Sequence, residues 1–99
     1  MTRRSDAAPL LSIIVPAFDA AAHLDRALAG LDVVGGGEGV VVDDGSTDET
    51  AAIAARWAQR YPHRYRVVAQ TNLGHGGAIM RGVDAARGTY VRVLDADDR

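Results

Sequence analysis

Three carboxylates stand close together near the end of the sequence, directly after an apolar stretch. Asp95, Asp97 and Asp98 follow Tyr90–Leu94, whose composition is typical of a β-strand. If the extended backbone continues, Asp95 and Asp97 lie on the same side, roughly 7 Å apart at Cα. Crowded carboxylates repel each other unless a cation joins them, and carboxylate oxygens are ligands that Mg²⁺ and Mn²⁺ prefer. The spacing therefore predicts a divalent-metal site at Asp95 and Asp97. The alternative is a polar turn after the strand that simply contains two aspartates.

A second acidic pair has the same setting. Asp43 and Asp44 follow the apolar run Val40–Val42 and precede Gly45. In an open parallel sheet, ligands bind at the carboxyl ends of the strands, so both acidic pairs are expected to face one crevice. Asp44 is the stronger candidate for ligand binding, because adjacent strand residues point to opposite sides. The alternative is that Asp44 only shapes the turn before Gly45.

The glycine-rich segment Asn72–Gly77 is expected to be a loop at the same edge of the sheet. Its glycines, Gly74 among them, allow the backbone to approach a ligand closely, and the following helix offers free N–H groups to an anion. His75 could add a hydrogen bond to a phosphate, or it could be a solvent-facing loop histidine. Phe18, two residues after Pro16, could stack on a base or pack beneath its own loop.

Composition limits the classes of function. The 99 residues are 47% hydrophobic, carry a formal charge of −2 and contain no cysteine. These values fit one soluble domain and exclude a disulfide framework or a thiolate metal site. The basic residues are scattered, and Arg60, Arg64 and Arg66 are expected on a solvated face, so no nucleic-acid partner is predicted. No apolar run is long enough for a membrane span or an export signal, and a cytoplasmic location is the default expectation.

Apolar runs alternate with helical spacing in the order βαβαβαβ, which predicts an α/β fold with a mostly parallel sheet. The expected strands cover 11–15, 40–42, 65–69 and 89–94, and the expected helices cover 21–31, 47–60 and 78–86. Residues 1–8 are interpreted as a disordered lead-in and residues 9–99 as the domain. Gly35–Gly39 is interpreted as a linker loop, and Pro16 as the end of the first strand. Ser46 and Glu49 are expected to form a capping box that starts the second helix at Thr47.

Four segments resemble, in order and spacing, the nucleotide-sugar half of family 2 glycosyltransferases. They are Ile14–Phe18, Val41–Asp48, Asn72–Ala78 and Gly88–Asp98. The resemblance implies a Rossmann-like GT-A half-domain, apparently truncated, in which residues 9–99 form an incomplete nucleotide-sugar-binding part. It also implies a glycosyltransferase that takes a nucleoside-diphosphate sugar as donor and an acceptor of unknown identity.

The resemblance also implies roles for individual residues. The nucleotide-sugar contacts would be Pro16, Phe18, Asp43, Asp44, Asn72, Gly74, His75 and Asp95. Asp95 and Asp97 would bind Mg²⁺ or Mn²⁺. The family often has Pro-x-Tyr-Asn-Glu where this sequence has Phe18, Asp19 and Ala20, so a tyrosine hydroxyl and a glutamate are missing. The catalytic base and acceptor site of the family lie beyond the position of Arg99. No catalytic residue is therefore assigned, and the 99-residue chain alone is expected to be inactive.

Other classes of protein fit parts of the pattern. A non-catalytic nucleotide-binding module would use the same pocket but would transfer no sugar. A haloacid-dehalogenase-type phosphatase would use Asp95 as nucleophile and Asp97 as acid, but that motif normally opens its domain. A phosphoacceptor receiver domain would need a lone aspartate at the end of the third strand, where this sequence has Ala69–Thr71.

Overall fold

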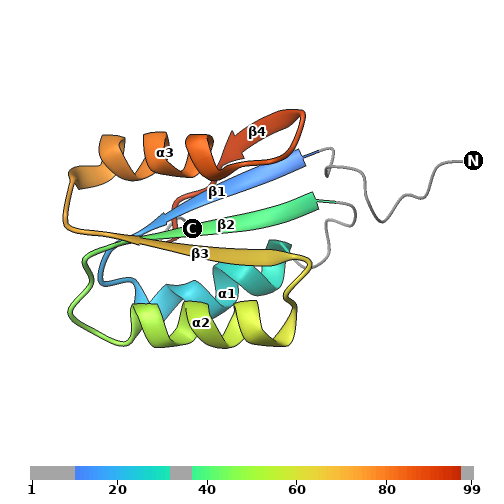
Figure 1. The fold of residues 1–99 in the computed structure, drawn as a ribbon. Helices are drawn as coiled ribbons and strands as arrows, with labels where there is room; N and C mark the ends of the chain where they lie inside the picture. The colour runs from blue at the N-terminus through green and yellow to red at the C-terminus, as the bar shows by residue number, and fades with distance from the viewer. Residues whose placement is uncertain (1–10, 32–36, 97–99) are drawn as a thin grey trace, which may run out of the picture.

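The computed structural model describes residues 11–31 and 37–96. Strands and helices alternate in the order β1 Leu11–Ala17, α1 Ala21–Leu31, β2 Gly37–Asp44, α2 Thr50–Arg60, β3 Tyr65–Gln70, α3 Gly74–Ala85 and β4 Tyr90–Val93. All strand pairs are parallel, and the sheet has the order β3-β2-β1-β4 (Figure 1). The predicted α/β fold is therefore confirmed. The predicted lead-in, residues 1–8, lies outside the described residues, as do Asp97 and Asp98.

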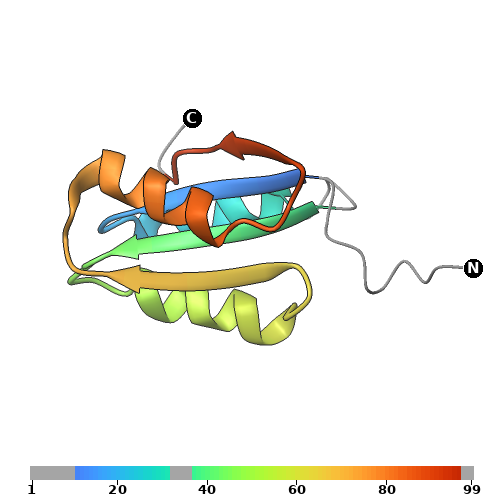
Figure 2. The same ribbon diagram turned by 45° about the horizontal axis from the view of Figure 1, so that its top comes forward.

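The helices cover both faces of the sheet. Figure 1 shows α1 and α2 on one face and α3 on the other. The chain winds outward from β1 to β3 and then returns past β1 to form β4 (Figure 2). The winding direction thus reverses between β1 and β4, and such a reversal opens a crevice at the carboxyl ends of the strands.

Two apolar clusters fill the space between the sheet and its helices. On the α1 and α2 side the cluster includes Ile13, Val15, Val41, Leu24, Leu28 and Ile53, and on the α3 side it is Ile14, Val40, Val42 and Ala78. Successive strand residues point to opposite faces. Even-numbered residues of β1 and β2 therefore face α3, and odd-numbered residues face α1 and α2.

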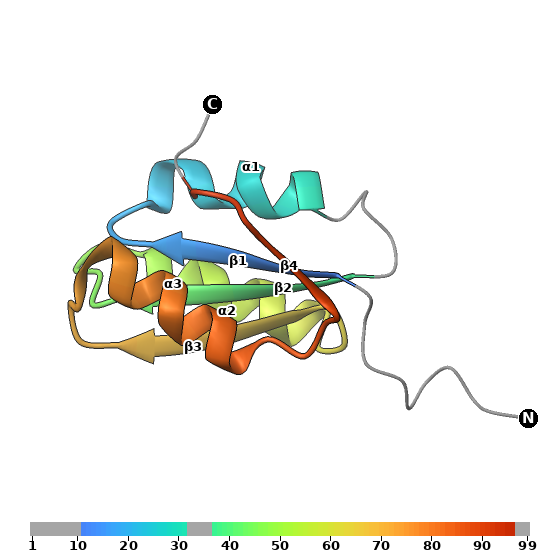
Figure 3. The same cartoon turned by 90° about the horizontal axis from the view of Figure 1, so that it is seen from above.

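Figure 3, seen from above, shows α3 crossing in front of β2, and at Gly82 the helix lies very close to the sheet. A Cβ atom at Gly82 would lie 2.2 Å from Ile14 Cγ2 and 3.2 Å from Val42 Cγ2. Ile14 and Val42 are fully buried and belong to the sheet, so neither can give way easily. A residue without a side chain is needed at this position.

Replacing Gly82 by alanine is expected to destabilise the protein by about 1–3 kcal/mol, since overpacking outweighs the gain in helix propensity. The matched control is Gly30→Ala in α1, where an added Cβ has no atom within 4 Å. This control should gain up to about 1 kcal/mol. Urea unfolding measures both changes, and equal stabilisation of both variants would contradict the close approach.

The interpretation of Gly35–Gly39 as a linker loop is wrong for Gly37–Gly39, which belong to β2. Residues 35 and 36 lie outside the described residues. A Cβ atom at Gly39 would lie 2.8 Å from Cδ1 of Tyr65, and one at Gly37 would lie 2.9 Å from the Leu11 carbonyl oxygen. These two glycines permit close packing within the sheet.

Three predicted boundaries also differ from the structure. Pro16 lies inside β1, because the pairing of β1 with β4 ends at Ile14 and the missing N–H interrupts no ladder there. The capping box is absent, since α2 begins at Thr50 and its N-cap Glu49 makes no side-chain hydrogen bond. The third helix begins at Gly74, so residues 74–77 form its first turn and are not a loop.

Candidate functional site at the carboxyl end of the sheet

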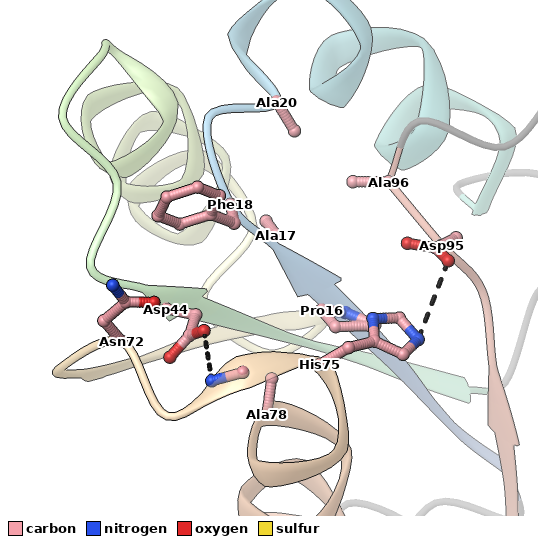
Figure 4. A pocket seen from close by; sticks show the side chains of 11 residues that line it. Pro16, Ala17, Phe18, Ala20, Asp44, Asn72, His75, Ala78, Asp95 and Ala96 are labelled. Carbon is pink, nitrogen blue, oxygen red and sulfur yellow. Dashed lines mark hydrogen bonds and ion pairs between the residues drawn. The ribbon is translucent and has the colours of Figure 1, made fainter.

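A cavity of about 380 Å³ opens at the carboxyl ends of the strands. Of the eight residues predicted to bind the nucleotide sugar, those that line it are Pro16, Phe18, Asp44, Asn72, Gly74, His75 and Asp95. Small side chains, Ala17, Ala20, Ala78 and Ala96, complete the wall. In Figure 4, Phe18, Asp44 and Asn72 lie on one side of the pocket, and His75 and Asp95 lie on the other.

Asp44 holds the start of α3. One carboxylate oxygen accepts hydrogen bonds from Gln70 Nε2 at 2.9 Å and from the Leu73 N–H at 2.6 Å, and the other accepts from the Gly74 N–H at 2.9 Å. Burial by itself would raise the pKa of Asp44, but these three hydrogen bonds lower it below its usual value. The negative charge also lies where the helix dipole favours it. Asp44 therefore faces the pocket and also fixes its wall.

Asp43 faces away from the pocket. It has the same orientation as Val41, toward α1 and α2, and its Oδ1 accepts a hydrogen bond from the Ser46 N–H at 3.2 Å. Its side chain is buried and does not line the cavity. The structure thus brings together seven of the eight predicted residues, and Asp43 supports the neighbouring turn.

Asp95 is the carboxylate that opens most freely to the pocket. It follows β4, its side chain is 47% exposed, and Oδ2 lies 3.7 Å from His75 Nε2 on α3. A half-exposed oxygen donor fits a hard divalent cation such as Mg²⁺ or Mn²⁺. Within residues 11–31 and 37–96, no three acidic or histidine side chains form a metal-binding group. The second predicted ligand, Asp97, lies outside that part of the chain.

Sequence reasoning missed the residues that fasten the loop containing Phe18. Asp19, directly after Phe18, accepts a hydrogen bond from the Thr47 N–H at 2.8 Å and donates its own N–H to Ser46 Oγ at 2.9 Å. Ser46 is thus engaged with the β1–α1 connection and does not cap α2. No local pattern signals this contact, because Asp19 and Thr47 are 28 residues apart.

Sequence reasoning also missed a buried glutamate at the opposite end of the sheet. Glu38 on β2 is only 2% exposed, and Oε2 accepts hydrogen bonds from Ser12 Oγ at 2.6 Å and the Arg87 N–H at 2.7 Å. Oε1 lies 3.3 Å from Arg66 Nε and 3.2 Å from both Nε and Nη2 of Arg87. Arg66 also donates to the carbonyl oxygen of Ala85, the last residue of α3. The expectation that Arg66 lies on a solvated face is therefore wrong.

Comparisons with known proteins point to one family. Residues 12–99 match the model of glycosyl transferase family 2. The chain belongs to this family. It is 43% identical over 94 residues to a PGL/p-HBAD biosynthesis glycosyltransferase of Mycobacterium bovis, a match that covers 93% of the chain and 37% of the relative. It is 37% identical over 90 residues to the uncharacterized glycosyltransferase YibD of Escherichia coli, covering 89% of the chain and 26% of the relative.

Solved structures show the same fold. The mannosyltransferase PcManGT from Pyrobaculum calidifontis, in complex with GDP-Man and Mn²⁺, superimposes with a TM-score of 0.80 at 29% identity. That match covers 93% of the chain and 30% of the mannosyltransferase. S. aureus TarS 1-349 gives the same TM-score and identity over 90% of the chain and 28% of its own.

By resemblance, this chain is therefore part of a glycosyltransferase with the GT-A fold. These matches confirm the predicted family, fold and enzyme class. The phosphatase and receiver alternatives find no support in these matches. The chain spans 26% to 37% of the length of the curated relatives named above. In residues 11–31 and 37–96, none of the helices combines the length and apolar character of a membrane span.

Proposed function

We propose that this pocket binds a nucleoside-diphosphate sugar together with a divalent cation, as the donor site of a glycosyltransferase. The observation that carries the proposal is the convergence of an aromatic ring, an amide side chain, the start of α3 and the Asp95 carboxylate on one cavity. These groups match the parts of such a donor, which are a base, a ribose, a diphosphate and its cation. The PcManGT complex with GDP-Man and Mn²⁺ has the same fold.

Each side chain of the pocket suits one part of the donor. Phe18 is 51% exposed and offers a flat face on which a base can stack. Pro16, inside β1, also lines the cavity. Asp44 Oδ2 can accept a further hydrogen bond from a hydroxyl of the ribose or an N–H of the base. Asn72, in the loop that Asp44 holds, offers its side-chain amide to the ribose or the base. Asp43 acts through the turn at Ser46.

The diphosphate is placed between α3 and Asp95. The first-turn N–H groups of α3 from His75 onward point out of the helix start, and an added Cβ at Gly76 would have no atom within 4 Å, so an anion can approach the backbone. Asp95, with Asp97, would hold Mn²⁺ or Mg²⁺. When bound, the cation would offset charge on the departing nucleoside diphosphate. His75, whose Nε2 lies 3.7 Å from Asp95 Oδ2, would donate a ring N–H to a phosphate oxygen.

Transfer to an acceptor is proposed for the whole enzyme. The acceptor hydroxyl must be held within about 3 Å of the reacting carbon and, for inversion, of a base. The described residues around the cavity supply the donor contacts, and the acceptor is not assigned.

Nucleotide binding is expected to depend on a divalent cation. Asp95 and a diphosphate are both anionic, so their approach without a cation is repulsive. Titration calorimetry with UDP and GDP should show at least about tenfold tighter binding with Mn²⁺ or Mg²⁺ than with EDTA. Adenosine without phosphates is the control, since its binding should not respond to the cation. Equal nucleotide affinity in Mn²⁺ and in EDTA would refute the metal role.

A further inference from the structure

Side-chain hydrogen bonds join the β1–α1 connection to the β2–α2 connection. The Asp19 N–H donates to Ser46 Oγ at 2.9 Å, and Asp19 Oδ1 accepts from the Thr47 N–H at 2.8 Å and from Thr47 Oγ1 at 3.3 Å. All three bonds are exposed, and none of the three residues lines the pocket. This contact therefore holds two loops together without occupying the donor site.

The junction continues inward along the start of α1. The Ala20 N–H donates to Thr50 Oγ1 at 2.8 Å, and the Ala21 N–H donates to Asp48 Oδ2 at 3.2 Å. Asp48 Oδ1 in turn accepts from the Thr50 N–H at 2.9 Å. The N–H groups at a helix start have no partner within the helix. Here the neighbouring connection supplies those partners, so the start of α1 is fixed relative to α2.

Asp19 also sets the direction of the chain. Its φ is 49°, in the left-handed region that residues other than glycine rarely adopt and that Asp and Asn tolerate best. Both neighbours of Asp19 line the pocket, but Phe18, just before it, is 51% exposed, whereas Ala20, just after it, is 4% exposed and belongs to the core. The left-handed turn at Asp19 therefore separates an outward-facing ring from an inward-facing alanine.

We infer that Asp19 is a positioning residue, which holds the ring of Phe18 over the pocket for the base of the donor. This inference rests on the proposed function. A half-exposed ring on an unfastened loop would lose conformational freedom on binding, and that loss weakens affinity. The bonds to Ser46 and Thr47 remove much of this freedom before the donor arrives. Asp19 itself does not line the pocket.

The test measures affinity for two ligands in Mn²⁺: the tighter-binding of UDP and GDP, and inorganic pyrophosphate. Asp19→Ala should weaken nucleoside-diphosphate binding about tenfold and leave pyrophosphate binding unchanged, because only the nucleoside part reaches Phe18. Asp19→Asn should restore most of the affinity, since it keeps an acceptor oxygen and the left-handed turn. Asp19→Gly, which keeps the turn and lacks the carboxylate, replaces Asp19→Ala if the latter does not fold.

A double-mutant cycle gives the second readout. In a Phe18→Ala background, Asp19→Ala should cause no further loss of nucleoside-diphosphate affinity. Three results would each overturn the inference and leave the proposed function standing. They are a further tenfold loss in the Phe18→Ala background, an equal loss of pyrophosphate affinity in Asp19→Ala, and an Asp19→Ala variant that binds like the wild type. A wild-type chain that binds neither UDP nor GDP would overturn the proposed function, and the inference with it.

Discussion

Replacing Glu38 by glutamine is expected to lower the free energy of unfolding by about 2–3 kcal/mol. Five donor groups, from Ser12, Arg66 and Arg87, lie within 3.3 Å of the two Glu38 oxygens. Glutamine has one acceptor oxygen and an NH₂ group that would face donors. It would therefore leave donors around this buried side chain unpaired, where β1, β2 and the α3–β4 connection meet. Urea unfolding at neutral pH measures the difference.

The control for this substitution is Glu49→Gln, the same chemical change at an exposed N-cap residue without a side-chain hydrogen bond. Its expected effect is below about 1 kcal/mol, because only the favourable position of its charge at the start of α2 is lost. If both variants unfold at the same urea concentration as the wild type, Glu38 contributes no more than a surface carboxylate does.

The stability supplied by Glu38 should also depend on pH. Burial alone would raise the pKa of Glu38, but hydrogen bonds from Ser12 and the Arg87 N–H, together with the charge of Arg66, bring it below its usual value of 4.5. Because the folded-state pKa is lowered, the unfolded chain binds the proton more readily, and acid favours unfolding. The difference in free energy of unfolding between the wild type and Glu38→Gln should therefore be largest above pH 4.5 and shrink as the pH falls below it. A difference that grows with acid would contradict this assignment.

Asp44→Ala is expected to weaken Mn²⁺-dependent nucleoside-diphosphate binding about tenfold to a hundredfold, with the folded circular-dichroism spectrum retained. The carboxylate lines the pocket proposed for the donor and also holds Leu73 and Gly74 at the start of α3. Its loss removes a ligand contact and releases the wall that carries Asn72 and His75. Calorimetry measures the affinity, and faster hydrogen exchange of the Leu73 and Gly74 amides would report the released wall.

Asp84→Ala, an exposed aspartate of α3, is the matched control for loss of one negative charge and should bind like the wild type. Asp44→Asn keeps one acceptor oxygen and should lose less affinity than Asp44→Ala. If Asp44→Ala speeds exchange of the two amides while affinity is unchanged, the carboxylate serves α3 and not the donor.

The features predicted correctly from sequence depend on local patterns. Leu24, Ala27, Leu28 and Leu31 repeat at helical spacing, and α1 spans the predicted residues 21–31. The pocket residues were found because they follow apolar runs, and parallel strands present their carboxyl ends at one edge. Both inferences need only near neighbours in the sequence and the alternation of strands and helices.

The features that were missed depend on partners far along the chain. Glu38 lies among glycines, and its partners Ser12 and Arg87 are 26 and 49 residues away. Ser46 has a local partner in Glu49 by sequence pattern, but its hydroxyl accepts from Asp19, 27 residues away. A side chain with two possible partners takes the one that the tertiary fold brings closer, and the local pattern carries no information on that choice.

Two carboxylates of β2 fix the chain at the two ends of α3. Asp44 holds the start of the helix, and Glu38 holds Arg87, two residues after its end. Glu38 and Asp44 are six residues apart, an even number, so both point to the α3 face, about 20 Å from each other. The twelve residues of α3 span about 18 Å, which matches that distance. A one-residue insertion between the two carboxylates would turn one of them to the opposite face, and a two-residue insertion would carry it about 6.6 Å past the end of the helix. The lengths of β2 and α3 can therefore change only together, with two added strand residues matched by about one added helical turn.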